Sequence, residues 1–379
     1  MDSIIYVSPH TDQYGAERSM IANIKNIMSH GIHVLLIIPT NGRIEELLSA
    51  AGIDYIIEKF YDVINHENRV RIHYGIGKQA VNTYKAIKVK KLLFERDLTP
   101  MFVHSNSLTS DFGIILSETL GVPHIQHIRE LGQHDFGMTF DMGIKHFSKT
   151  CAKSQKIICI SDAVRDYYKQ YLPDEKLIRI YNGVAAENPD VFIPNRKAYN
   201  PLQLVMVGRV SEEKGQIQAI KAVQKLKDKI NLHLDLWGDG VDKELLERYI
   251  SENSLENCVC LCGYSKHISY KKYHIALMCS KCEAFGRVTV EYMFKGLPVI
   301  GSNTGGTKEI VVDGKTGLLY EQGNVEELAD CIKALYDKED LRYQLAINGV
   351  SRAQTEFSEK AYCEKVYEVY KRVCPDYGW

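Results

Sequence analysis

The sequence lacks two features that would point early to a partner: a net charge and a long hydrophobic run. Its 379 residues contain 47 lysines and arginines against 48 aspartates and glutamates, so the net charge is −1. Nucleic-acid binding needs an excess of positive charge, so no such partner is expected. No apolar stretch approaches the roughly 18 residues of a membrane span. The start, Met1-Asp2-Ser3, lacks the basic region of a signal peptide, and we expect a cytoplasmic protein.

Signatures of cofactor and metal binding are also missing. No Gly-x-Gly-x-x-Gly follows the first expected strand, where residues 9–15 read PHTDQYG, and this argues against a nicotinamide-binding domain. Cys258, Cys260 and Cys262 alternate along an expected strand and should share one face. Cys279 and Cys282 form a C-x-x-C pair. Neither set has a second pair at zinc spacing, so we expect free thiols and no metal site.

The first half of the sequence alternates between strand and helix patterns. Hydrophobic residues make up 45% and charged residues 25%, which is ordinary for a soluble globular protein, and the length suits two domains. We expect strands at 3–8, 34–38, 55–57, 101–104, 124–127 and 156–160, and helices at 17–30, 44–51, 111–120 and 162–171. This alternation predicts an α/β protein with a parallel sheet and helices on both faces.

A segment with several prolines, 182–201, interrupts the alternation and is the best candidate for a linker. Beyond it we expect strands at 202–207, 232–237, 258–262, 275–279, 298–301 and 316–319, and helices at 215–228, 242–252, 325–336 and 358–373. We therefore divide the chain into domains 1–187 and 188–355 and a C-terminal helical segment, 356–379. The simplest architecture is two doubly wound lobes that face each other across a cleft.

Two glutamates, Glu283 and Glu291, flank an expected strand–loop–helix junction. Glu283 follows the apolar run 275–279, and Glu291 lies one turn into the helix. Both carboxylates should therefore face the crevice where α/β sheets bind ligands. The backbone N–H groups of 285–288, at the helix start, suit a phosphate. Carboxylates for hydroxyls around amides for phosphate would form a site for a nucleotide sugar.

Two cations, Arg209 and Lys214, lie in the loop after strand 202–207 and Gly208. Cations at a helix start oppose the helix dipole unless an anion binds there. A diphosphate would satisfy both cations and the helix, although two solvated loop cations would have the same spacing. Gly238 follows the next strand and would let a nucleotide approach the backbone, as would a plain tight turn there.

Other positions allow both a functional and a structural interpretation. Gly15 would let a ligand approach the first turn of an early helix, in which Glu17 and Arg18 could be a solvated pair. His127 ends an expected strand, where it could hydrogen-bond a sugar hydroxyl or be purely structural. His104 ends another strand and could line the same cleft. Further along, Thr307 could be a helix N-cap and Glu309 a favourable partner of that helix's dipole.

Together these motifs resemble the retaining GT-B glycosyltransferases of family 4. The residues that carry the resemblance are Gly208-Arg209, Lys214-Gly215, Glu283-x7-Glu291, Gly296-x-Pro298-Val299-Ile300, Gly305-Gly306-x-x-Glu309 and Gly314-x-x-Gly317-Leu318-Leu319. A looser match is Tyr14-Gly15-Ala16-Glu17-Arg18, where Tyr14 replaces the first of two glycines that the family often has. The resemblance is specific over 205–320 and vague over 40–100, the region in which such enzymes choose their acceptors.

The resemblance implies a role for each matching residue. Arg209 and Lys214 would neutralise the donor diphosphate, Glu291 would hold the ribose hydroxyls, and Glu283 would contact hydroxyls of the transferred sugar. His127 would lie beside the reacting sugar, Gly15 would contact the diphosphate from the opposite lobe, and the C-terminal helix would pack on the first lobe. The remaining donor-binding positions would be Gly208, Gly238, Tyr264, Ile268, Ala284, Phe285, Gly286, Arg287 and Val288.

The implied reaction moves a sugar from a nucleotide-diphosphate sugar to a hydroxyl of a glycan, a glycolipid or a small acceptor, with retention of configuration. UDP is the first expectation for the nucleotide, and bacterial surface-polysaccharide or glycoconjugate assembly is the implied setting. No Asp-x-Asp motif provides a metal clamp, so the two cations would replace a divalent ion and no cofactor is expected. A sugar-nucleotide epimerase of similar fold, a phosphorylase and a non-catalytic nucleotide-sugar-binding protein stay open as alternatives.

A basic stretch, 84–96, mixes five cations with apolar residues and could form an amphipathic helix on an anionic membrane surface. An ordinary surface helix before the strand 101–104 would show the same pattern. We therefore keep peripheral membrane association as a hypothesis. The sequence indicates no oligomeric state.

Overall fold

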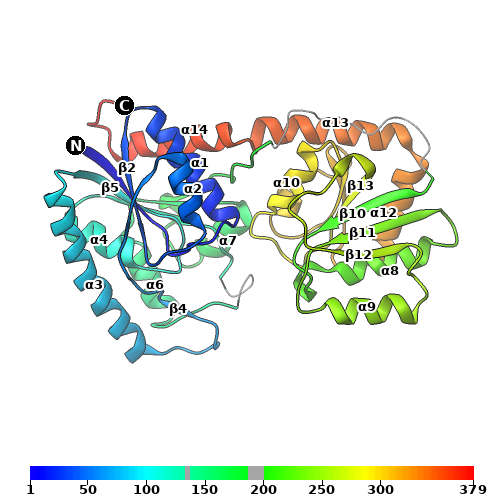
Figure 1. Cartoon of the computed structure of the whole chain (residues 1–379), viewed down its shortest axis with the longest axis horizontal. Coiled ribbons are helices and arrows are strands. Elements are labelled where there is room, and N and C mark those ends of the chain that lie inside the picture. Colours follow the sequence, from blue (N-terminus) through cyan, green and yellow to red (C-terminus); the bar gives the residue numbers. More distant parts are fainter. Residues whose placement is uncertain (133–136, 187–199) are drawn as a thin grey trace. The chain divides into compact units, whose positions relative to one another are not determined.

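The computed structural model describes residues 1–132, 137–186 and 200–379, which form two compact units (Figure 1). The first unit consists of Met1–Gly183 together with Glu359–Trp379, and the second of Val184–Ser358. The expected domain boundary at 187/188 and most of the expected linker lie outside the described residues. Each unit contains a parallel sheet with helices, so the predicted α/β class is confirmed.

The first unit contains a seven-stranded parallel sheet in the order β3-β2-β1-β5-β6-β8-β9. Its strands are β1 (Asp2–Val7), β2 (His33–Ile38), β3 (Asp54–Ile57), β5 (Thr99–Ser105), β6 (His124–Ile128), β8 (Lys156–Cys159) and β9 (Leu177–Arg179). Its helices are α1 (Gly15–Ser29), α2 (Ile44–Ala51), α3 (Ile72–Glu95), α4 (Phe112–Leu120), α6 (Ile144–Cys151), α7 (Asp162–Lys169), the short η1 (Asp174–Lys176) and α14 (Glu359–Val373). β4 (Ile64–Asn65) and β7 (Thr139–Phe140) pair antiparallel in a separate small sheet.

The strands of this sheet bury both faces because successive side chains point to opposite sides. Ile4 and Tyr6 of β1 pack in one hydrophobic cluster with α1, α2 and α14. Ile5 and Val7 pack in a second cluster with α3 and α4. In Figure 1 the red C-terminal α14 lies alongside the blue α1, and the two helices are in contact. The last helix of the chain thus completes the core of the first unit.

The second unit contains a six-stranded parallel sheet in the order β12-β11-β10-β13-β14-β15. Its strands are β10 (Leu202–Val207), β11 (Leu232–Trp237), β12 (Val259–Gly263), β13 (Ile275–Met278), β14 (Val299–Ser302) and β15 (Gly317–Tyr320). Its helices are α8 (Gln216–Leu226), α9 (Lys243–Glu252), α10 (Arg287–Phe294), α11 (Thr307–Ile310), α12 (Val325–Asp337), α13 (Glu339–Glu356) and the short η2 (Glu212–Lys214) and η3 (Tyr270–Lys272).

Each sheet reverses its winding direction once. In the first unit the reversal lies between β1 and β5, and in the second between β10 and β13. At such a switch point the loops after two neighbouring strands diverge and leave a crevice at the carboxyl edge of the sheet. The residues that follow β10 and β13 are therefore those that the sequence singles out for ligand binding. Across the described residues, we find no helix with both the length and the apolar character that crossing a membrane requires.

Candidate active site

The predicted donor-binding residues gather at the switch point of the second sheet. Gly208 and Arg209 directly follow β10, and Lys214 lies in η2, before α8. Glu283 lies between β13 and α10, and Glu291 one turn into α10. The strand order places the loops after β10 and β13 next to each other. The arrangement expected from the motifs is therefore present within this unit.

Lys214 and Glu283 are in direct contact. Lys214 Nζ donates to Glu283 Oε1 at 2.6 Å, and Ser280 Oγ donates to the same oxygen at 2.6 Å. The lysine side chain is 30% exposed and that of the glutamate 14%. This half-buried pair joins the loop after β10 to the loop after β13 and fixes a cation in the crevice.

Arg209 has a different environment. Its carbonyl accepts from Gln216 Nε2 at 2.8 Å, which holds the backbone, while the side chain is exposed. Within the described residues, the guanidinium group forms no hydrogen bond or ion pair. Its charge helps to lower the pKa of Glu213, after hydrogen bonds from the Glu213 backbone and from Ser211. A fixed backbone with a free cationic group is suitable for an anionic ligand.

Glycines let the loops of this edge approach one another closely. A Cβ on Gly215, at φ +72°, would lie 2.2 Å from the carbonyl oxygen of Cys279. A Cβ on Gly238 would lie 1.9 Å from the carbonyl oxygen of Gly208. Gly306 donates its N–H to the carbonyl of Glu283 at 2.7 Å, and a Cβ there would lie 2.2 Å from the Phe285 carbonyl oxygen. The glycine turn before α11 thus supports the loop that carries Glu283.

The helix start between the two glutamates is defined by Gly286, the N-cap of α10, at φ +96°. Ala284 and Phe285 are buried just before it, and Val288 lies in its first turn. Arg287 Nε donates to Glu291 Oε1 at 3.1 Å across one turn. Tyr264 and Ile268 lie after β12, and Tyr264 is strongly exposed. Within the described part of the chain, neither residue forms a hydrogen bond or ion pair with Lys214 or Glu283.

His127, the predicted catalytic residue of the first unit, is the last residue but one of β6 and is completely buried. Its Nδ1 lies 3.3 Å from His104 Nε2 and 3.5 Å from Arg129 Nη2, while its Nε2 is buried without a hydrogen-bond partner. Burial lowers the pKa of His127 well below its ordinary value, and the charges of Arg129 and His104 lower it further. The imidazole is therefore neutral, with one nitrogen free for a ligand.

His104 belongs to a buried network rather than to an exposed cleft wall. Its Nδ1 lies 2.6 Å from Tyr370 Oη of α14, and its ring stacks on Tyr6. Asn23 Nδ2 donates to Tyr370 Oη at 2.9 Å. Gly15 is the first residue of α1, the helix that also carries Asn23, and Tyr14 is the N-cap of that helix. These contacts favour the structural interpretation of His104, because Nδ1 contacts the C-terminal helix and Nε2 contacts His127.

Three further expectations about side chains are corrected. Glu17 is not part of a solvated pair, because it is 1% exposed. Thr307 is the first residue of α11 and not its N-cap, which is Gly306. Cys258 precedes β12 and packs on the hydrophobic core, so it does not share a face with Cys260 and Cys262. For Glu17 and Cys258, local sequence could not show what the neighbouring elements would cover.

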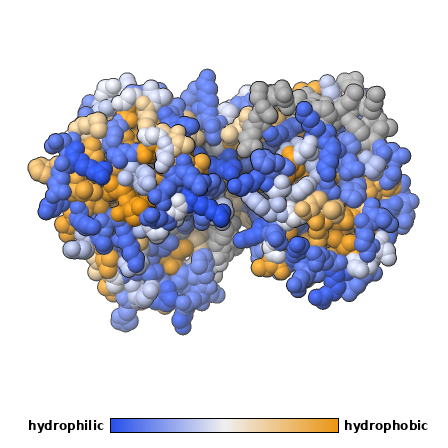
Figure 2. Space-filling model, in the orientation of Figure 1, coloured by the Kyte–Doolittle hydropathy of each residue, from blue (hydrophilic) through white to orange (hydrophobic). Residues whose placement is uncertain are grey.

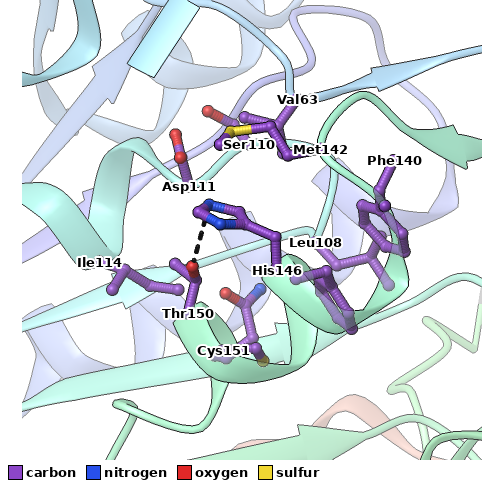
Figure 3. Close-up of a pocket in the computed structure, with 13 residues that line it drawn as sticks. Val63, Leu108, Ser110, Asp111, Ile114, Phe140, Met142, His146, Thr150 and Cys151 are labelled. Carbon is purple, nitrogen blue, oxygen red and sulfur yellow. Dashed lines mark hydrogen bonds between the residues drawn. The ribbon is translucent and has the colours of Figure 1, made fainter. Parts of the chain in front are cut away.

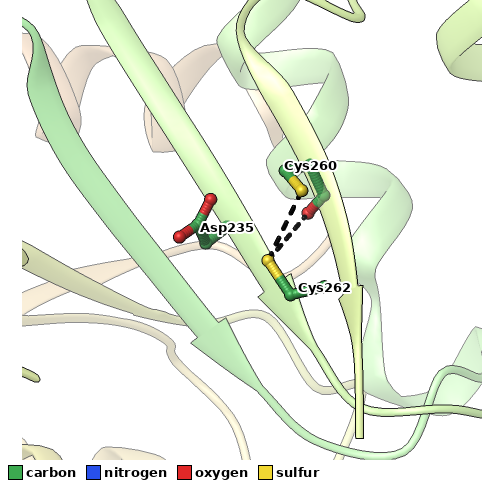
Figure 4. Close-up of side chains that lie close together, drawn as sticks. All are labelled: Asp235, Cys260 and Cys262. Carbon is green, nitrogen blue, oxygen red and sulfur yellow. Dashed lines mark hydrogen bonds between the residues drawn. The ribbon is translucent and has the colours of Figure 1, made fainter. Parts of the chain in front are cut away.

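A group of potential metal ligands and a small cavity are separate from these residues. Asp235, Cys260 and Cys262 place their ligand atoms within 4.8 Å of one another, at an edge of the second sheet (Figure 4). Asp235 Oδ2 already accepts from Lys272 Nζ and Tyr273 Oη, both at 2.6 Å. Burial, with contributions from Cys260 and Asp235, raises the pKa of the Cys262 thiol to about 12. Asp235 and the two thiols therefore already have hydrogen-bond partners within the protein.

The cavity lies in the first unit, under Asp111 and His146 (Figure 3). Its volume of about 30 Å³ is room for about two water molecules, too little for a sugar. Burial raises the pKa of Asp111 despite a hydrogen bond from Asn82 Nδ2 at 2.8 Å. No predicted site residue lines this cavity.

The sequence matches known protein families along most of its length. Residues 14–188 match the family model described as Glycosyltransferase Family 4, and residues 189–352 match the model described as Glycosyl transferases group 1. An uncharacterised glycosyltransferase of Methanocaldococcus jannaschii is 32% identical over 269 residues, which cover 69% of this chain and 72% of the relative.

Solved structures show the same fold. HepE of Anabaena in complex with UDP superposes with a TM-score of 0.79 at 20% identity, over 98% of this chain and all of the other. Its complex with UDP-glucose gives a TM-score of 0.76 at 21% identity, over 98% of this chain and 99% of the other. Both comparisons extend along nearly the whole chain.

Proposed function

The chain belongs to the GT-B glycosyltransferases of family 4, and we propose that it transfers a sugar from a UDP-sugar to a hydroxyl group with retention of configuration. The observation that carries this proposal is the pairing of Lys214 with Glu283 near Arg209, whose guanidinium group has no partner among the described residues, at the switch point of the second sheet. UDP is proposed as the nucleotide because HepE of Anabaena, a structural neighbour, binds UDP and UDP-glucose.

The proposed roles follow from charge and position. Arg209 and Lys214 neutralise the diphosphate together with backbone amides of residues 285–288, and Gly15, Gly208 and Gly238 allow close approach to the backbone. Glu283 binds hydroxyls of the transferred sugar and Glu291 those of the ribose. Tyr264 and Ile268 contact the base. His127 offers its unpartnered Nε2 to a sugar hydroxyl.

The chemistry needs stabilisation of a leaving group. The bond between the anomeric carbon and the phosphate oxygen breaks, and UDP leaves with an additional negative charge. The acceptor oxygen bonds to the anomeric carbon from the same face, and its proton passes to the leaving phosphate. Preorganised cations stabilise the developing charge without moving, so the proposal needs no carboxylate nucleophile.

We further propose that no metal ion takes part, because Arg209 and Lys214 supply positive charge where a divalent ion would otherwise stand. EDTA should then leave transfer intact. Inhibition by EDTA that Mg²⁺ or Mn²⁺ reverses would contradict this proposal.

A donor screen followed by a transfer assay tests the function. A nucleotide sugar present at 100 times its Kd stabilises the folded state by about 2.7 kcal/mol, so the true donor should stand out in thermal unfolding. UDP release should then depend on an acceptor and yield a glycoside by mass spectrometry. Conversion of the donor without any acceptor would instead indicate an epimerase, and binding without turnover a non-catalytic protein.

For the setting, we propose bacterial surface-polysaccharide or glycoconjugate synthesis in the cytoplasm, at the inner face of the membrane. The support is α3, a 24-residue helix whose aromatic residues Tyr74, Tyr84 and Phe94 are exposed. Figure 2 shows apolar side chains interspersed among hydrophilic ones on the surface of the first unit. Lys85 and Lys88 both bind Glu58, which reduces the basic charge of the helix. Cosedimentation with liposomes that shows no dependence on anionic lipid would end this proposal.

A further inference from the structure

Arg129, the residue directly after β6, contacts two polar side chains at the carboxyl edge of the first sheet. Its Nε donates to Asn106 Oδ1 at 3.0 Å, and its Nη2 lies 3.5 Å from His127 Nδ1. The register of β5 with β6 ends at Ser105 and Gln126, so Asn106 and His127 are the next residues along the two strands. All three side chains are buried. One arginine therefore lies against two buried polar neighbours.

The guanidinium group of Arg129 can only donate hydrogen bonds, so it determines which atoms of its neighbours accept. Asn106 turns Oδ1 toward the arginine and Nδ2 away from it. A second contact, from Arg129 Nε to the Asn106 backbone carbonyl at 3.1 Å, holds the same orientation. His127 must present an unprotonated Nδ1. Burial keeps the imidazole neutral by lowering the pKa of His127, so its one ring proton is on Nε2.

His104 supports the same assignment from the other side of the ring. Its Nε2 lies 3.3 Å from His127 Nδ1, and its Nδ1 lies 2.6 Å from Tyr370 Oη of α14. Since His127 Nδ1 accepts, His104 Nε2 carries a proton, and its Nδ1 accepts from the Tyr370 hydroxyl. Two donors then share one lone pair of His127, which accounts for the two long distances. The last helix of the chain thus helps to place the proton of His127.

Two donor atoms remain. His127 Nε2 and Asn106 Nδ2 are both buried, and neither has a hydrogen-bond partner among the described residues. A buried donor without a partner is costly, so native proteins retain few of them without a reason. Arg129 occupies an acceptor atom of each neighbour, and their N–H groups are therefore available to a ligand.

We propose that Arg129 is a positioning residue of the glycosyl transfer, which orients His127 and Asn106 as hydrogen-bond donors to oxygen atoms of the bound sugar. This inference rests on the proposed function and deepens it, because it assigns the direction of the hydrogen bond at His127. The sugar oxygen accepts from Nε2–H, and that nitrogen has no lone pair with which to remove a proton. His127 is therefore a donor in the reaction and not its general base.

The position of the proton can be measured without any substrate. The chain has 13 histidines, and nitrogen-15 NMR of the labelled full chain distinguishes protonated from unprotonated ring nitrogens. The signals that His127→Gln removes are those of His127. We expect a protonated Nε2 and an unprotonated Nδ1 near neutral pH. A proton on Nδ1, protons on both nitrogens, or the mixture of forms that a solvated histidine shows would overturn the inference.

Two variants of equal length test the direction of the bond to the sugar. His127→Gln introduces an amide that can donate, whereas His127→Glu introduces a carboxylate that only accepts. His127→Gln should turn over the UDP-sugar within about tenfold of the wild-type rate, the equivalent of one ordinary hydrogen bond, and His127→Glu should lose at least about tenfold more. UDP affinity, a property of the second unit, checks that each variant is folded. A His127→Glu variant as active as His127→Gln would contradict the inference.

A double-mutant cycle tests whether Arg129 acts through His127. Arg129→Met should reduce turnover by about tenfold or more in the wild-type chain and much less in a His127→Leu background, where its partner is missing. Arg129→Lys keeps a donor and should recover part of the loss, and it replaces Arg129→Met in the cycle if that variant does not fold. Arg372→Met, at an exposed position of α14, is the control. An equal loss in both backgrounds would mean that Arg129 only stabilises the fold.

The same experiments separate this inference from the proposed function. If UDP-sugars turn over and the proton lies on Nδ1, only the roles of Arg129 and His127 fail. If no UDP-sugar binds or turns over, the proposed function itself fails, while the NMR spectrum still decides where the proton of His127 lies.

Discussion

At the scale of single residues, the two cations of the donor site differ in how they are held. Lys214 is bound to Glu283, whereas Arg209 has a fixed backbone and a guanidinium group without a partner in the part of the chain that the structure describes. An exposed arginine is common, but one placed beside a switch point, with a neighbouring lysine already oriented, is suited to a diphosphate. Each cation should therefore matter more for the transition state than for the fold.

We expect Arg209→Ala and Lys214→Ala each to reduce turnover by about 10²-fold or more, the usual cost of removing one donor that stabilises developing charge. Steady-state kinetics of UDP release measure this. Lys225→Ala is the control, because that lysine pairs with Glu326 on the surface far along α8. The assignment is wrong if both variants turn over at a rate close to that of the wild-type chain.

Glu291 allows a sharper test of its assigned partner, the ribose. The wild-type chain should bind UDP more tightly than 2′,3′-dideoxy-UDP, and Glu291→Ala should bind the two equally, because the residue and the hydroxyls form one pair. Titration calorimetry with both nucleotides completes the cycle. Arg287 contacts Glu291 and would lose this partner, so the difference between the two ligands is the informative quantity rather than either affinity. A difference that persists in the variant would place the ribose elsewhere.

At the residue scale, the sequence predicted positions where the strand assignment fixes them. Arg209, Lys214 and Glu283 lie in the loops that follow β10 and β13, so a correct strand assignment brings them to the same edge. The burial of Glu17 could not be predicted in this way, because it depends on tertiary packing and not on the position of the residue in α1. Arg129 lies outside regular elements and carries no motif, so no signal in the sequence marks it.

At the scale of elements, the turn before α11 supports the loop of Glu283 through Gly306. We expect Gly306→Ala to destabilise the second unit by about 1–3 kcal/mol, the usual cost of overpacking, because the new Cβ would lie 2.2 Å from the Phe285 carbonyl oxygen. UDP affinity should fall with it. Thermal unfolding and UDP titration measure the two effects.

Gly77 provides the matched control for this substitution. It lies in α3, and a Cβ there would meet nothing within 4 Å. Gly77→Ala should stabilise the helix by up to about 1 kcal/mol, because alanine has the higher helix propensity. Equal changes in unfolding stability in the two variants would show that the close approach at Gly306 does not contribute to the stability of the second unit.

Most elements were predicted within one or two residues, because hydrophobic periodicity marks a strand or helix that buries one face. Two long helices were not predicted, one of them in part and the other completely. The N-terminal half of α3 was missed, because the exposed apolar residues Ile72, Tyr74 and Ile76 obscure the helical periodicity of its hydrophobic residues. α13 was missed altogether, and its buried face includes Arg342 and Gly349, which no hydrophobic pattern would select. Arg342 is accommodated there because Nη1 donates to the Leu335 carbonyl at 2.5 Å.

At the scale of the whole molecule, alternation of strands and helices predicted the class but not the strand order. The order is what brings β10 beside β13 and β1 beside β5, and thus creates both switch points. Parallel pairing between strands far apart in sequence depends on which faces the helices cover. In the first unit this includes α14, whose Val366 and Tyr370 complete a cluster begun by Ile4 and Met20.

The balance of protons between the folded and unfolded states is also a property of the whole molecule. Burial lowers the pKa of His124 to about 3, and burial lowers the pKa values of His104 and His127 as well. Below pH 6.5, the ordinary value, the unfolded chain takes up protons at these positions and the folded chain does not. Their contribution to stability is complete above pH 6.5 and is lost as the pH falls, in the case of His124 toward about 3.

Buried carboxyl groups act in the opposite direction. Burial raises the pKa values of Glu17, Asp62 and Asp111, so the folded state binds protons more readily than the unfolded state at these sites. Their contribution increases as the pH falls through their folded values toward 4. The two groups therefore compete below pH 6.5, and only a variant can separate them.

His124→Gln removes one member without touching the carboxyl groups. Its ring nitrogens contact Ser105 Oγ at 2.9 Å and Ser154 Oγ at 2.8 Å, so glutamine keeps part of the bonding and lowers stability somewhat at every pH. We expect the loss of unfolding free energy between pH 6.5 and 5 to be smaller in the variant, by up to about 1.4 kcal/mol per pH unit. Urea unfolding at several pH values measures the slope, with exposed His267→Gln as the control. Identical slopes in His124→Gln and the wild-type chain would mean that His124 takes up a proton in the folded state, which its two serine contacts and its burial argue against.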